Sequence, residues 1–537
     1  MMAQKTLLIG LDGATFTLLD PFMAGGVMPF LKSFAERGVR AELRSVVPPL
    51  TPPAWTSVLT GRSPGYHGIF DFFQADTPGS ISIRLATSGD IRVDHVAKMI
   101  NQHGLRANII NFPVHFPPAP IDGVVIAGWM PWRQLRLGCH PPDLYDRLKA
   151  LPGFNPRELA MDMGLEARAT EGCAEEEYVD WAALHARREE RWLEVLKYLD
   201  ENDSSEFTAI LLDGPDKVQH LCWRFLDPVL WPVNPTPEEE RIREASIDYY
   251  RQLDSILEEL VESAGSEATI VMVSDHGFGA STEVFHVNTW LEQAGYLVWS
   301  KDVTSELNEQ DTLGMGHISR HSRWLDWDRT KAYVATPTSN GIHIVRAEQH
   351  DGRGVPAADY PRFRAELLDA LLSYVDEKDG NPVVTAAATR EDAFAGPAGE
   401  LAPDLTLSLR DGGLVSILPS DTPLKPRPRP VGTHRPLGVF LAAGPGIRRN
   451  VMIEELSVMD VAPIVLHSLG IAVPESLEGH VPGSAYETDY LAKRPVELVP
   501  PGNGIEGERV DTSQQIVYDE EAEAVLMARL RELGYIE

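Results

Sequence analysis

Short apolar runs without alternating polar residues recur along the chain, and each is followed by a polar residue or a glycine. A strand covered by helices on both faces is apolar along its whole length, because neither face meets water. The runs therefore predict the strands of a buried, largely parallel sheet. They are Leu7–Leu11, Ala107–Ile110, Val124–Ala127, Ala209–Leu212, Ile270–Val273 and Val439–Ala443.

Helical patterns lie between these runs. The stretch Pro29–Arg37 is followed by glycine, a common helix stop. The stretch Thr236–Ala264 begins with Thr236 and Glu239 at capping-box spacing and is also followed by glycine. Strands alternating with helices predict an α/β fold, with a mostly parallel central sheet and helices on both faces. In such folds, ligands bind beyond the carboxyl ends of the strands.

The length of 537 residues favours one large catalytic core with insertions. We predict that residues 1–112 and 207–485 form this core, and that a second long excursion interrupts it at about 287–430. Residues 113–206 predict a cap-like insertion. We expect this cap to cover the ligand site and to contribute to its selectivity.

Two helices are predicted outside the core. The cap-like insertion has a proline-rich start, a WMPW cluster and a charged helix at Asp180–Leu199. Residues 486–537 predict a linker rich in proline and glycine, followed by an amphipathic helix at Asp519–Leu533.

The chain carries 79 acidic and 48 basic residues, a formal net charge of −31. An acidic surface disfavours nucleic-acid duplexes and anionic membranes, since both attract basic proteins. The three cysteines form no CxxC pair, which fits a reducing compartment. The N-terminus lacks signal-peptide features, and no apolar run approaches the roughly 18 residues that span a bilayer. These features predict a cytoplasmic protein.

Seven residues with side chains that can bind metal or act as a nucleophile lie near the ends of predicted strands or helices. Each has a structural explanation alone: Asp12 as a turn residue, Thr51 as a helix N-cap, and Asp216 with His220 as an exposed helical pair. Together, three carboxylates and three imidazoles suit Zn²⁺ or Mn²⁺. Metal coordination can also deprotonate a threonine hydroxyl, which makes it a nucleophile. The seven are Asp12, Thr51, Asp216, His220, Asp275, His276 and His434.

Two such cations would offset the three carboxylates and draw in a phosphate group. Paired metals can hold both the attacking and the leaving oxygen of a displacement at phosphorus. The residues therefore predict a small-molecule phosphate ester as the substrate.

Five segments, in this order, resemble the alkaline phosphatase superfamily and its type I phosphodiesterase/nucleotide pyrophosphatase family. They are LLIGLDG, TPPAWTSVLTGRSPGYHG, LLDGPDKVQHLCW, IVMVSDHGFG and GTHRPLG. The segments GTHRPLGVFLAAGPGI and DVAPIVLHSLGIAVPESLEGHV further resemble a group of predicted phosphohydrolases and phosphomutases.

The resemblance implies an alkaline phosphatase-like three-layer sandwich and two divalent metal ions, zinc or alternatively manganese. It also implies a phosphothreonine intermediate on Thr51 that water then hydrolyses. One metal would be held by Asp216, His220 and His434, and the other by Asp12, Asp275, His276 and the Thr51 oxygen.

The phosphate-binding residues depart from the family pattern. Nucleotide pyrophosphatases grip phosphate with the backbone N–H after the nucleophile and with an asparagine side chain. Here Pro52 has no N–H, and Ala54 stands in place of the asparagine. Asn111, Asn340 and Arg435 are the candidate replacements.

Three reactions stay open at this point. The chain could hydrolyse phosphodiesters or phosphomonoesters, or transfer phosphate to an acceptor as a phosphotransferase or phosphomutase. The third alternative is a metal-binding protein without catalysis.

Overall fold

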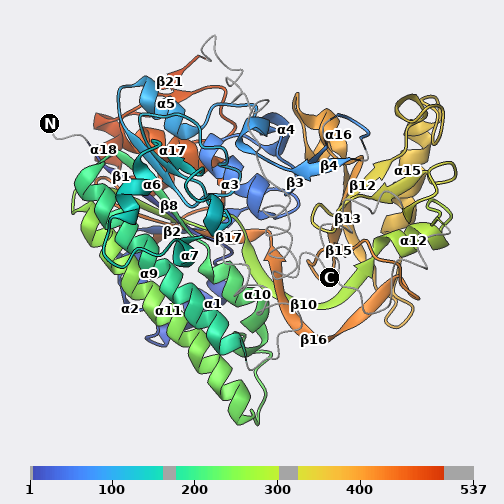
Figure 1. Ribbon diagram of the computed structural model, residues 1–537, viewed down its shortest axis with the longest axis horizontal. Helices are drawn as coiled ribbons and strands as arrows, with labels where there is room; N and C mark the ends of the chain where they lie inside the picture. The colour runs from blue at the N-terminus through green and yellow to red at the C-terminus, as the bar shows by residue number, and fades with distance from the viewer. Residues whose placement is uncertain (1–3, 76, 81, 161–176, 301–323, 501–537) are drawn as a thin grey trace.

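The computed structural model describes residues 4–75, 77–80, 82–160, 177–300 and 324–500. A larger lobe surrounds the central sheet, and a smaller β-rich lobe lies at the right of Figure 1. The strands of the central sheet are β1 (Thr6–Leu11), β2 (Val39–Arg44), β5 (Ala107–Ile110), β6 (Gly123–Ile126), β7 (Cys139–His140), β8 (Phe207–Leu212), β9 (Thr269–Val273), β17 (Leu437–Ala443), β18 (Val451–Met452) and β19 (Leu456–Ser457).

All six predicted apolar runs lie in this sheet. Its order is β18-β2-β17-β9-β1-β8-β5-β6-β7, and β19 pairs with β2. The five neighbours from β9 to β6 are parallel, whereas β17 runs antiparallel to both β9 and β2. Strand β2 was not predicted, because its sequence VRAELR alternates buried and more exposed residues and lacks a continuous apolar run.

Helices cover both faces of the sheet, because alternate strand residues point to opposite sides. In β1, Leu7 and Ile9 belong to one core and Leu8 to the other. The first core lies under α1 (Phe16–Ala24), α2 (Pro29–Arg37), α9 (Tyr178–Asn202), α10 (Gly214–Leu226) and α11 (Pro237–Ala264). The second lies under α3 (Thr51–Thr60), α5 (Val96–Gln102) and α17 (Val461–Ser468).

Two predicted helices have their predicted ends. Helix α2 spans Pro29–Arg37, as the sequence indicates. Helix α11 begins with the predicted capping box, in which the Glu239 N–H donates to Thr236 Oγ1 and the Thr236 N–H donates to Glu239 Oε2.

The described part of residues 113–206 does not form the predicted cap. Strands β6 and β7 extend the central sheet, and α9 packs beside α10 and α11 with Trp192 and Leu196 in the main core. This prediction was wrong because the proline-rich stretch suggested a separate unit, and edge strands of four and two residues carry little sequence pattern.

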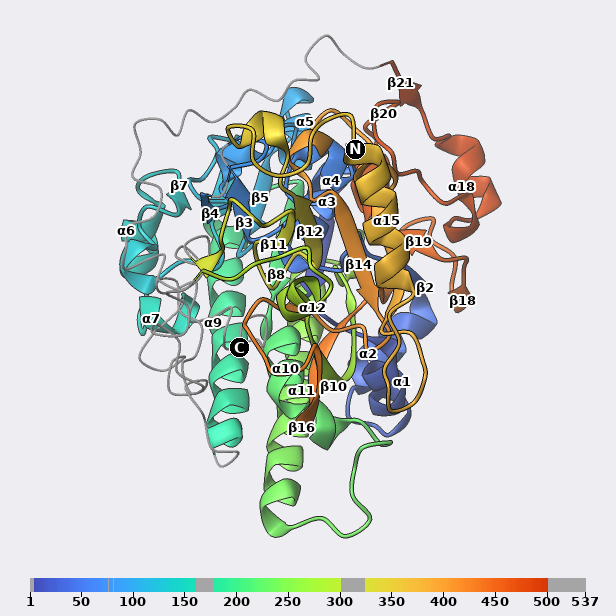
Figure 2. The same cartoon turned by 90° about the vertical axis from the view of Figure 1, so that its right-hand side faces the viewer.

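The excursion at 287–430 builds the second lobe, which has its own hydrophobic core. Strands β10 (Gly277–His286) and β16 (Leu424–Arg435) form an antiparallel ribbon that arches from the central sheet into this lobe (Figure 1). Helix α15 covers the lobe's four-stranded sheet (Figure 2). The other elements are α12 (Val287–Gln293), β11 (Ala332–Val334), β12 (Gly341–Ile344), α15 (Tyr360–Leu372), β13 (Val384–Thr389), α16 (Arg390–Ala393), β14 (Leu405–Leu409) and β15 (Val415–Ser416).

The remaining elements are short. They are α4 (Pro64–His67), β3 (Phe73–Ala75), β4 (Ile83–Leu85), α6 (Leu144–Lys149), α7 (Pro156–Leu159), β20 (Val473–Pro474), α18 (Thr488–Lys493) and β21 (Leu498–Val499). The predicted amphipathic helix Asp519–Leu533 lies outside the described residues. Among the helices of the described ranges, none combines the length and the apolar character that crossing a membrane requires.

Candidate metal centre

All seven predicted metal-binding and nucleophilic residues lie at one edge of the central sheet. The neighbouring strands β2, β17, β9, β1 and β8 supply them, so residues distant in the sequence meet. Because β17 is antiparallel, the residues before its first strand position lie at the same edge as the residues after its parallel neighbours. Asp12 follows β1, Thr51 follows β2, Asp216 and His220 follow β8, Asp275 and His276 follow β9, and His434 precedes β17.

Thr51 is the first residue of α3, and Leu50 is the N-cap. The interpretation of Thr51 as the N-cap is therefore wrong. The next residues, Pro52 and Pro53, have no N–H to donate to a capping side chain. The buried Thr51 hydroxyl instead lies 3.2 Å from Nε2 of His276.

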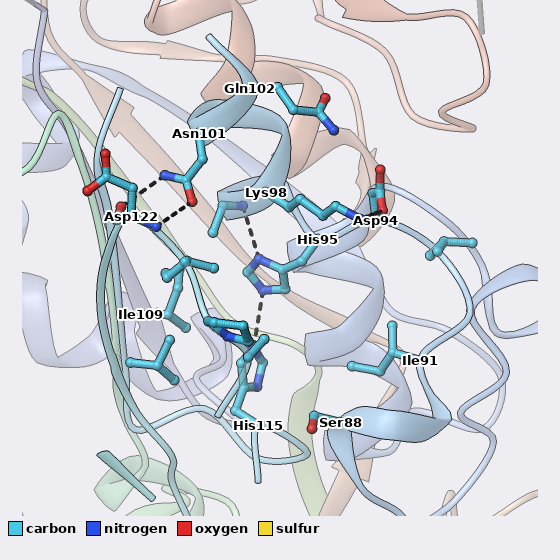
Figure 3. Close-up of a pocket in the computed structure, with 16 residues that line it drawn as sticks. Ser88, Ile91, Asp94, His95, Lys98, Asn101, Gln102, Ile109, His115 and Asp122 are labelled. Carbon is cyan, nitrogen blue, oxygen red and sulfur yellow. Dashed lines mark hydrogen bonds and ion pairs between the residues drawn. The ribbon is translucent and has the colours of Figure 1, made fainter. Parts of the chain in front are cut away.

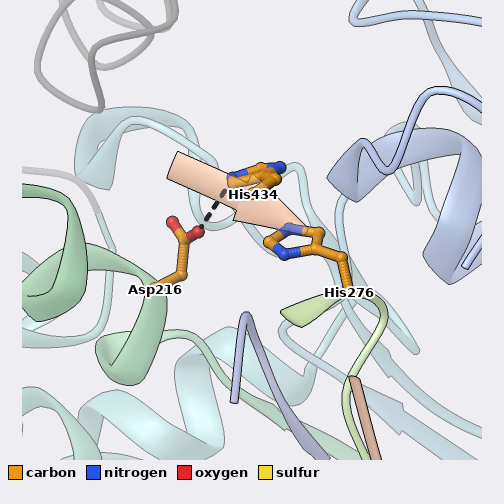
Figure 4. A group of neighbouring side chains, drawn as sticks. All are labelled: Asp216, His276 and His434. Carbon is orange, nitrogen blue, oxygen red and sulfur yellow. Dashed lines mark ion pairs between the residues drawn. The ribbon is translucent and has the colours of Figure 1, made fainter. Parts of the chain in front are cut away.

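Asp216, His220 and His434 form one group. Nε2 of His434 lies 3.2 Å from Oδ1 of Asp216, and Nε2 of His220 lies 3.3 Å from the same oxygen. Figure 4 marks the contact between Asp216 and His434 with a dashed line. The two Nε2 atoms are 3.3 Å apart. The predicted four-residue spacing on α10 thus brings Asp216 and His220 to one point, and β16 brings His434 to them.

His276 joins a second group with Asp12 and Asp275. Its Nε2 lies 3.3 Å from Oδ2 of Asp275 and 3.6 Å from Oδ1 of Asp12. Neither oxygen accepts a hydrogen bond from the described residues. The rings of His276 and His434 stack with centroids 3.5 Å apart, so the two groups adjoin.

Backbone carbonyls fix the same tautomer in all three imidazoles. A carbonyl oxygen only accepts hydrogen bonds, so each Nδ1 that faces one carries the proton, and each neutral Nε2 carries a lone pair. Burial lowers the pKa of His276 and His434, which favours their neutral forms. The carbonyl partners are Gly432 for His220 (3.2 Å), Gly277 for His276 (3.1 Å) and Pro49 for His434 (2.8 Å).

Burial opposes ionisation of all three carboxylates, but their pKa values shift in different directions. Burial and the neighbouring carboxylates raise the pKa of Asp12 well above its usual value, and burial raises the pKa of Asp275 to about 8. Burial also opposes ionisation of Asp216, but its interactions with the neighbouring His220 and Lys217 hold its pKa well below the usual value. Three Nε2 lone pairs therefore meet carboxylate oxygens that repel one another, an arrangement that suits divalent cations.

Helix α9 supports the helix that carries Asp216. Oε1 of Glu189 accepts the Gly214 N–H at 2.8 Å, and the Trp181 Nε1–H donates to the Lys217 carbonyl at 2.9 Å. Sequence reasoning missed these positioning residues and also the buried Lys217 side chain. The only signal was a lysine next to Asp216, and a lysine on a helix usually faces water.

The three candidate phosphate-binding residues make backbone contacts. Asn111 Nδ2 donates to the Leu211 carbonyl at 2.8 Å. The side chain of Asn340 bonds the backbone of Gly413 and Val415 in the second lobe. The Arg435 guanidinium donates to the carbonyls of Ala280 and His434. These bonds leave Asn340 apart from the seven residues and direct Arg435 to the β10–β16 ribbon.

A cavity of about 650 Å³ is lined by none of the ten predicted site residues. It lies between α5 and the outer face of β5 and β6, with His95 and His115 in its wall (Figure 3). The two Nε2 atoms are 3.1 Å apart, and the Ala97 N–H donates to Nδ1 of His95. These two imidazoles use their ring nitrogens for hydrogen bonds within the protein. We therefore place the candidate metal site at the edge of the central sheet and not in this cavity.

The family model described as "Type I phosphodiesterase / nucleotide pyrophosphatase" matches residues 6–436. The chain belongs to this family. The matched range includes all seven residues at the strand edge. The type I phosphodiesterase/nucleotide pyrophosphatase family contains phosphoester hydrolases that generally depend on divalent metals. A search among curated proteins gives no significant match.

Solved structures share the fold at low sequence identity. Phosphonoacetate hydrolase from Sinorhizobium meliloti, in complex with phosphonoacetate, is 14% identical with a TM-score of 0.51, covering 87% of this chain and 96% of its own. Human ectonucleotide pyrophosphatase/phosphodiesterase 5 is 15% identical with a TM-score of 0.49, covering 91% and 99%. The predicted alkaline phosphatase-like α/β fold is confirmed.

Proposed function

We propose that the protein is a two-metal hydrolase of small-molecule phosphate esters, with Thr51 as its nucleophile. One observation carries the proposal: three carboxylates and three imidazole lone pairs converge beside the Thr51 hydroxyl. Oδ1 of Asp12 and Oδ2 of Asp275 accept no hydrogen bond from the described residues, and such buried carboxylate oxygens are unfavourable unless cations lie among them.

Two divalent cations fit the two adjoining groups. Carboxylate and imidazole donors suit Zn²⁺, with Mn²⁺ as the alternative. When bound, the cations would supply positive charge that attracts phosphate and favours the ionised Thr51 hydroxyl. One would be held by Asp216, His220 and His434, and the other by Asp12, Asp275, His276 and Thr51.

The reaction follows from the position of Thr51 at the first turn of α3. The Thr51 oxygen attacks phosphorus, the bond to the leaving oxygen breaks, and the departing alcohol takes up the proton that Thr51 lost. Water then attacks the phosphothreonine, which returns the hydroxyl to Thr51 and releases the phosphate product. The positive end of the helix dipole favours a negative Thr51 oxygen.

The test compares p-nitrophenyl phosphate with its bis-ester, using metal-stripped protein reloaded with Zn²⁺ or Mn²⁺. We expect Thr51→Ala to lose at least about a thousandfold in kcat on either ester, as removal of a nucleophile does. The control is Thr60→Ala in the same helix, since the Thr60 hydroxyl donates to the Thr56 carbonyl and accepts the Arg62 N–H. Metal content should equal that of the wild type in Thr60→Ala. It is measured in Thr51→Ala as well, because that variant loses one proposed ligand oxygen, and the rates are compared at full metal loading.

Three outcomes would contradict this proposal. A Thr51→Ala variant with the full rate would exclude Thr51 as the nucleophile. Loaded wild-type protein that turns over neither ester would support a metal-binding protein without catalysis. Phosphate transfer to an added alcohol in place of hydrolysis would support a phosphotransferase.

A further inference from the structure

A lysine ammonium lies buried next to the candidate metal centre. Lys217 follows Asp216 on α10 and is 1% exposed. Its Nζ lies 3.3 Å from Oδ2 of Asp216 and 3.7 Å from Oδ2 of Asp213. Lysine is seldom fully buried unless its charge is paired, and here both partners are carboxylates.

The Lys217 ammonium also packs over the ring of Trp129. Nζ of Lys217 lies 4.2 Å from the ring centroid of Trp129, and Trp129 stacks on Phe72 at 5.4 Å. The backbone of Trp129 has a φ of 57°, a left-handed conformation that is rare for a bulky residue. Backbone strain of this kind is held mainly at functional sites. The Lys217 charge is therefore fixed at the strand edge that carries the seven residues.

The two oxygens of Asp216 have different partners. Oδ2 faces the Lys217 ammonium, whereas Oδ1 faces Nε2 of His220 and of His434. A single carboxylate thus separates the ammonium from the candidate cation site. At such short range inside a protein, a unit charge acts strongly on a bound anion.

The Lys217 charge makes the net charge of the metal-loaded site positive. Two divalent cations together with the carboxylates of Asp12, Asp213, Asp216 and Asp275 balance to zero when the imidazoles are neutral. Lys217 adds one positive charge to this balance. The usual phosphate grip is missing, since Pro52 has no N–H and Ala54 replaces the asparagine. A phosphate in this site therefore depends more on charge than on hydrogen bonds.

We propose that Lys217 is a specificity-determining residue, and that its charge makes the site prefer dianionic phosphate monoesters to monoanionic diesters. The inference rests on the proposed function and narrows its substrate class. A second negative charge on the phosphate doubles the attraction to a fixed cation, so the monoester gains more from Lys217 than the diester does.

The experiment measures kcat/KM for p-nitrophenyl phosphate and for its bis-ester at pH 8, where the monoester is dianionic. We expect Lys217→Met to lower kcat/KM for the monoester about tenfold more than for the diester. Lys217→Arg keeps the charge and should keep the ratio within about threefold of the wild type. Lys197→Met, at an exposed ion pair with Glu259, is the control for the loss of a lysine elsewhere.

The double variant Asp213→Asn/Lys217→Met separates charge from packing. It removes one charge of each sign, so the site regains its wild-type balance, and we expect the monoester preference to return. Asp213→Asn alone should raise that preference. A substrate-free readout accompanies the kinetics: inorganic phosphate should bind metal-loaded Lys217→Met about tenfold more weakly in a calorimetric titration.

Equal losses for both esters in Lys217→Met, with unchanged phosphate affinity, would overturn the inference and leave the proposed hydrolase intact. A double variant that stays as unselective as Lys217→Met would overturn it too. If the loaded wild-type protein cleaves neither ester, the proposed function itself fails. If Lys217→Met does not fold, the double variant and Asp213→Asn still test whether the monoester preference follows the charge at the site.

Discussion

Glu189 is a buried acid on helix α9. It is 1% exposed, and its Oε1 accepts hydrogen bonds from the Gly214 N–H and the Tyr249 hydroxyl. Burial and the nearby Asp213 raise its pKa from 4.5 to about 8. Between these two pH values the unfolded chain releases the proton and the folded chain keeps it, so folding loses stability as the pH rises.

Glu189→Gln should remove this pH dependence. The amide oxygen can still accept both hydrogen bonds, but the side chain no longer titrates. We expect wild type to lose on the order of 3–5 kcal/mol more than the variant between pH 5 and pH 9. Urea denaturation of both proteins, with a chelator present, measures the difference. Parallel curves across this range would show that Glu189 ionises normally.

At the scale of elements, β16 and α10 approach each other closely at Gly432. A Cβ there would overlap the backbone oxygen of Gln219 and the ring of Phe278. The Gly432 carbonyl also faces Nδ1 of His220, and the same strand carries His434 two residues later. The contact between these two elements therefore sets the spacing of one ligand group.

Gly432→Ala should move the strand away from the helix. We expect a loss of about 1–3 kcal/mol in stability, as in other overpacked sites, and weaker binding of the proposed metal at Asp216, His220 and His434. Thermal unfolding and metal titration measure both effects. The control is Gly483→Ala, where the nearest atom to an added Cβ is 4.0 Å away. If both variants behave alike, the close approach at Gly432 does not position His434.

Elements with a strong sequence signal were predicted well. Strand β5 and helix α2 have the predicted bounds, and the capping box of α11 is present. Strand β2 escaped prediction because one of its sides is more polar. The packing of α9 against α10 and α11 was also not predicted. The pattern of a helix indicates which face is buried, but it does not indicate which element that face contacts.

At the scale of the whole molecule, folding brings three buried carboxylates together. Bound cations would offset their repulsion and favour the folded state in proportion to affinity and concentration. We expect chelation to lower Tm by several degrees, because a cation at 100 times its Kd contributes about 2.7 kcal/mol. Differential scanning fluorimetry with and without Zn²⁺ or Mn²⁺ measures the change.

The matched variant for this test is His220→Ala, which removes one side chain from one ligand group. It should show a smaller metal-induced rise in Tm than the wild type. A wild-type Tm that no divalent cation changes would argue against the metal centre.

The second lobe is tied to the central lobe by Asp71. Its carboxylate accepts hydrogen bonds from the hydroxyls of Thr336 at 2.6 Å and Thr338 at 2.5 Å. The excursion at 287–430 was predicted as an interruption of the core, and it forms this lobe. The cap was placed in residues 113–206 instead, because proline and aromatic content cannot tell an inserted unit from edge strands of the main sheet.

The sequence by itself determined the α/β alternation and the seven chemically capable residues, since apolar runs and motif spacing are local properties of the chain. The tertiary structure decided that β2, β17, β9, β1 and β8 are neighbours, which brings those residues to one edge. It also decided that Lys217 is buried and that Asn340 serves the backbone of the second lobe. Strand order and the burial of a charge depend on contacts between segments far apart in the chain. Local sequence patterns therefore do not predict them.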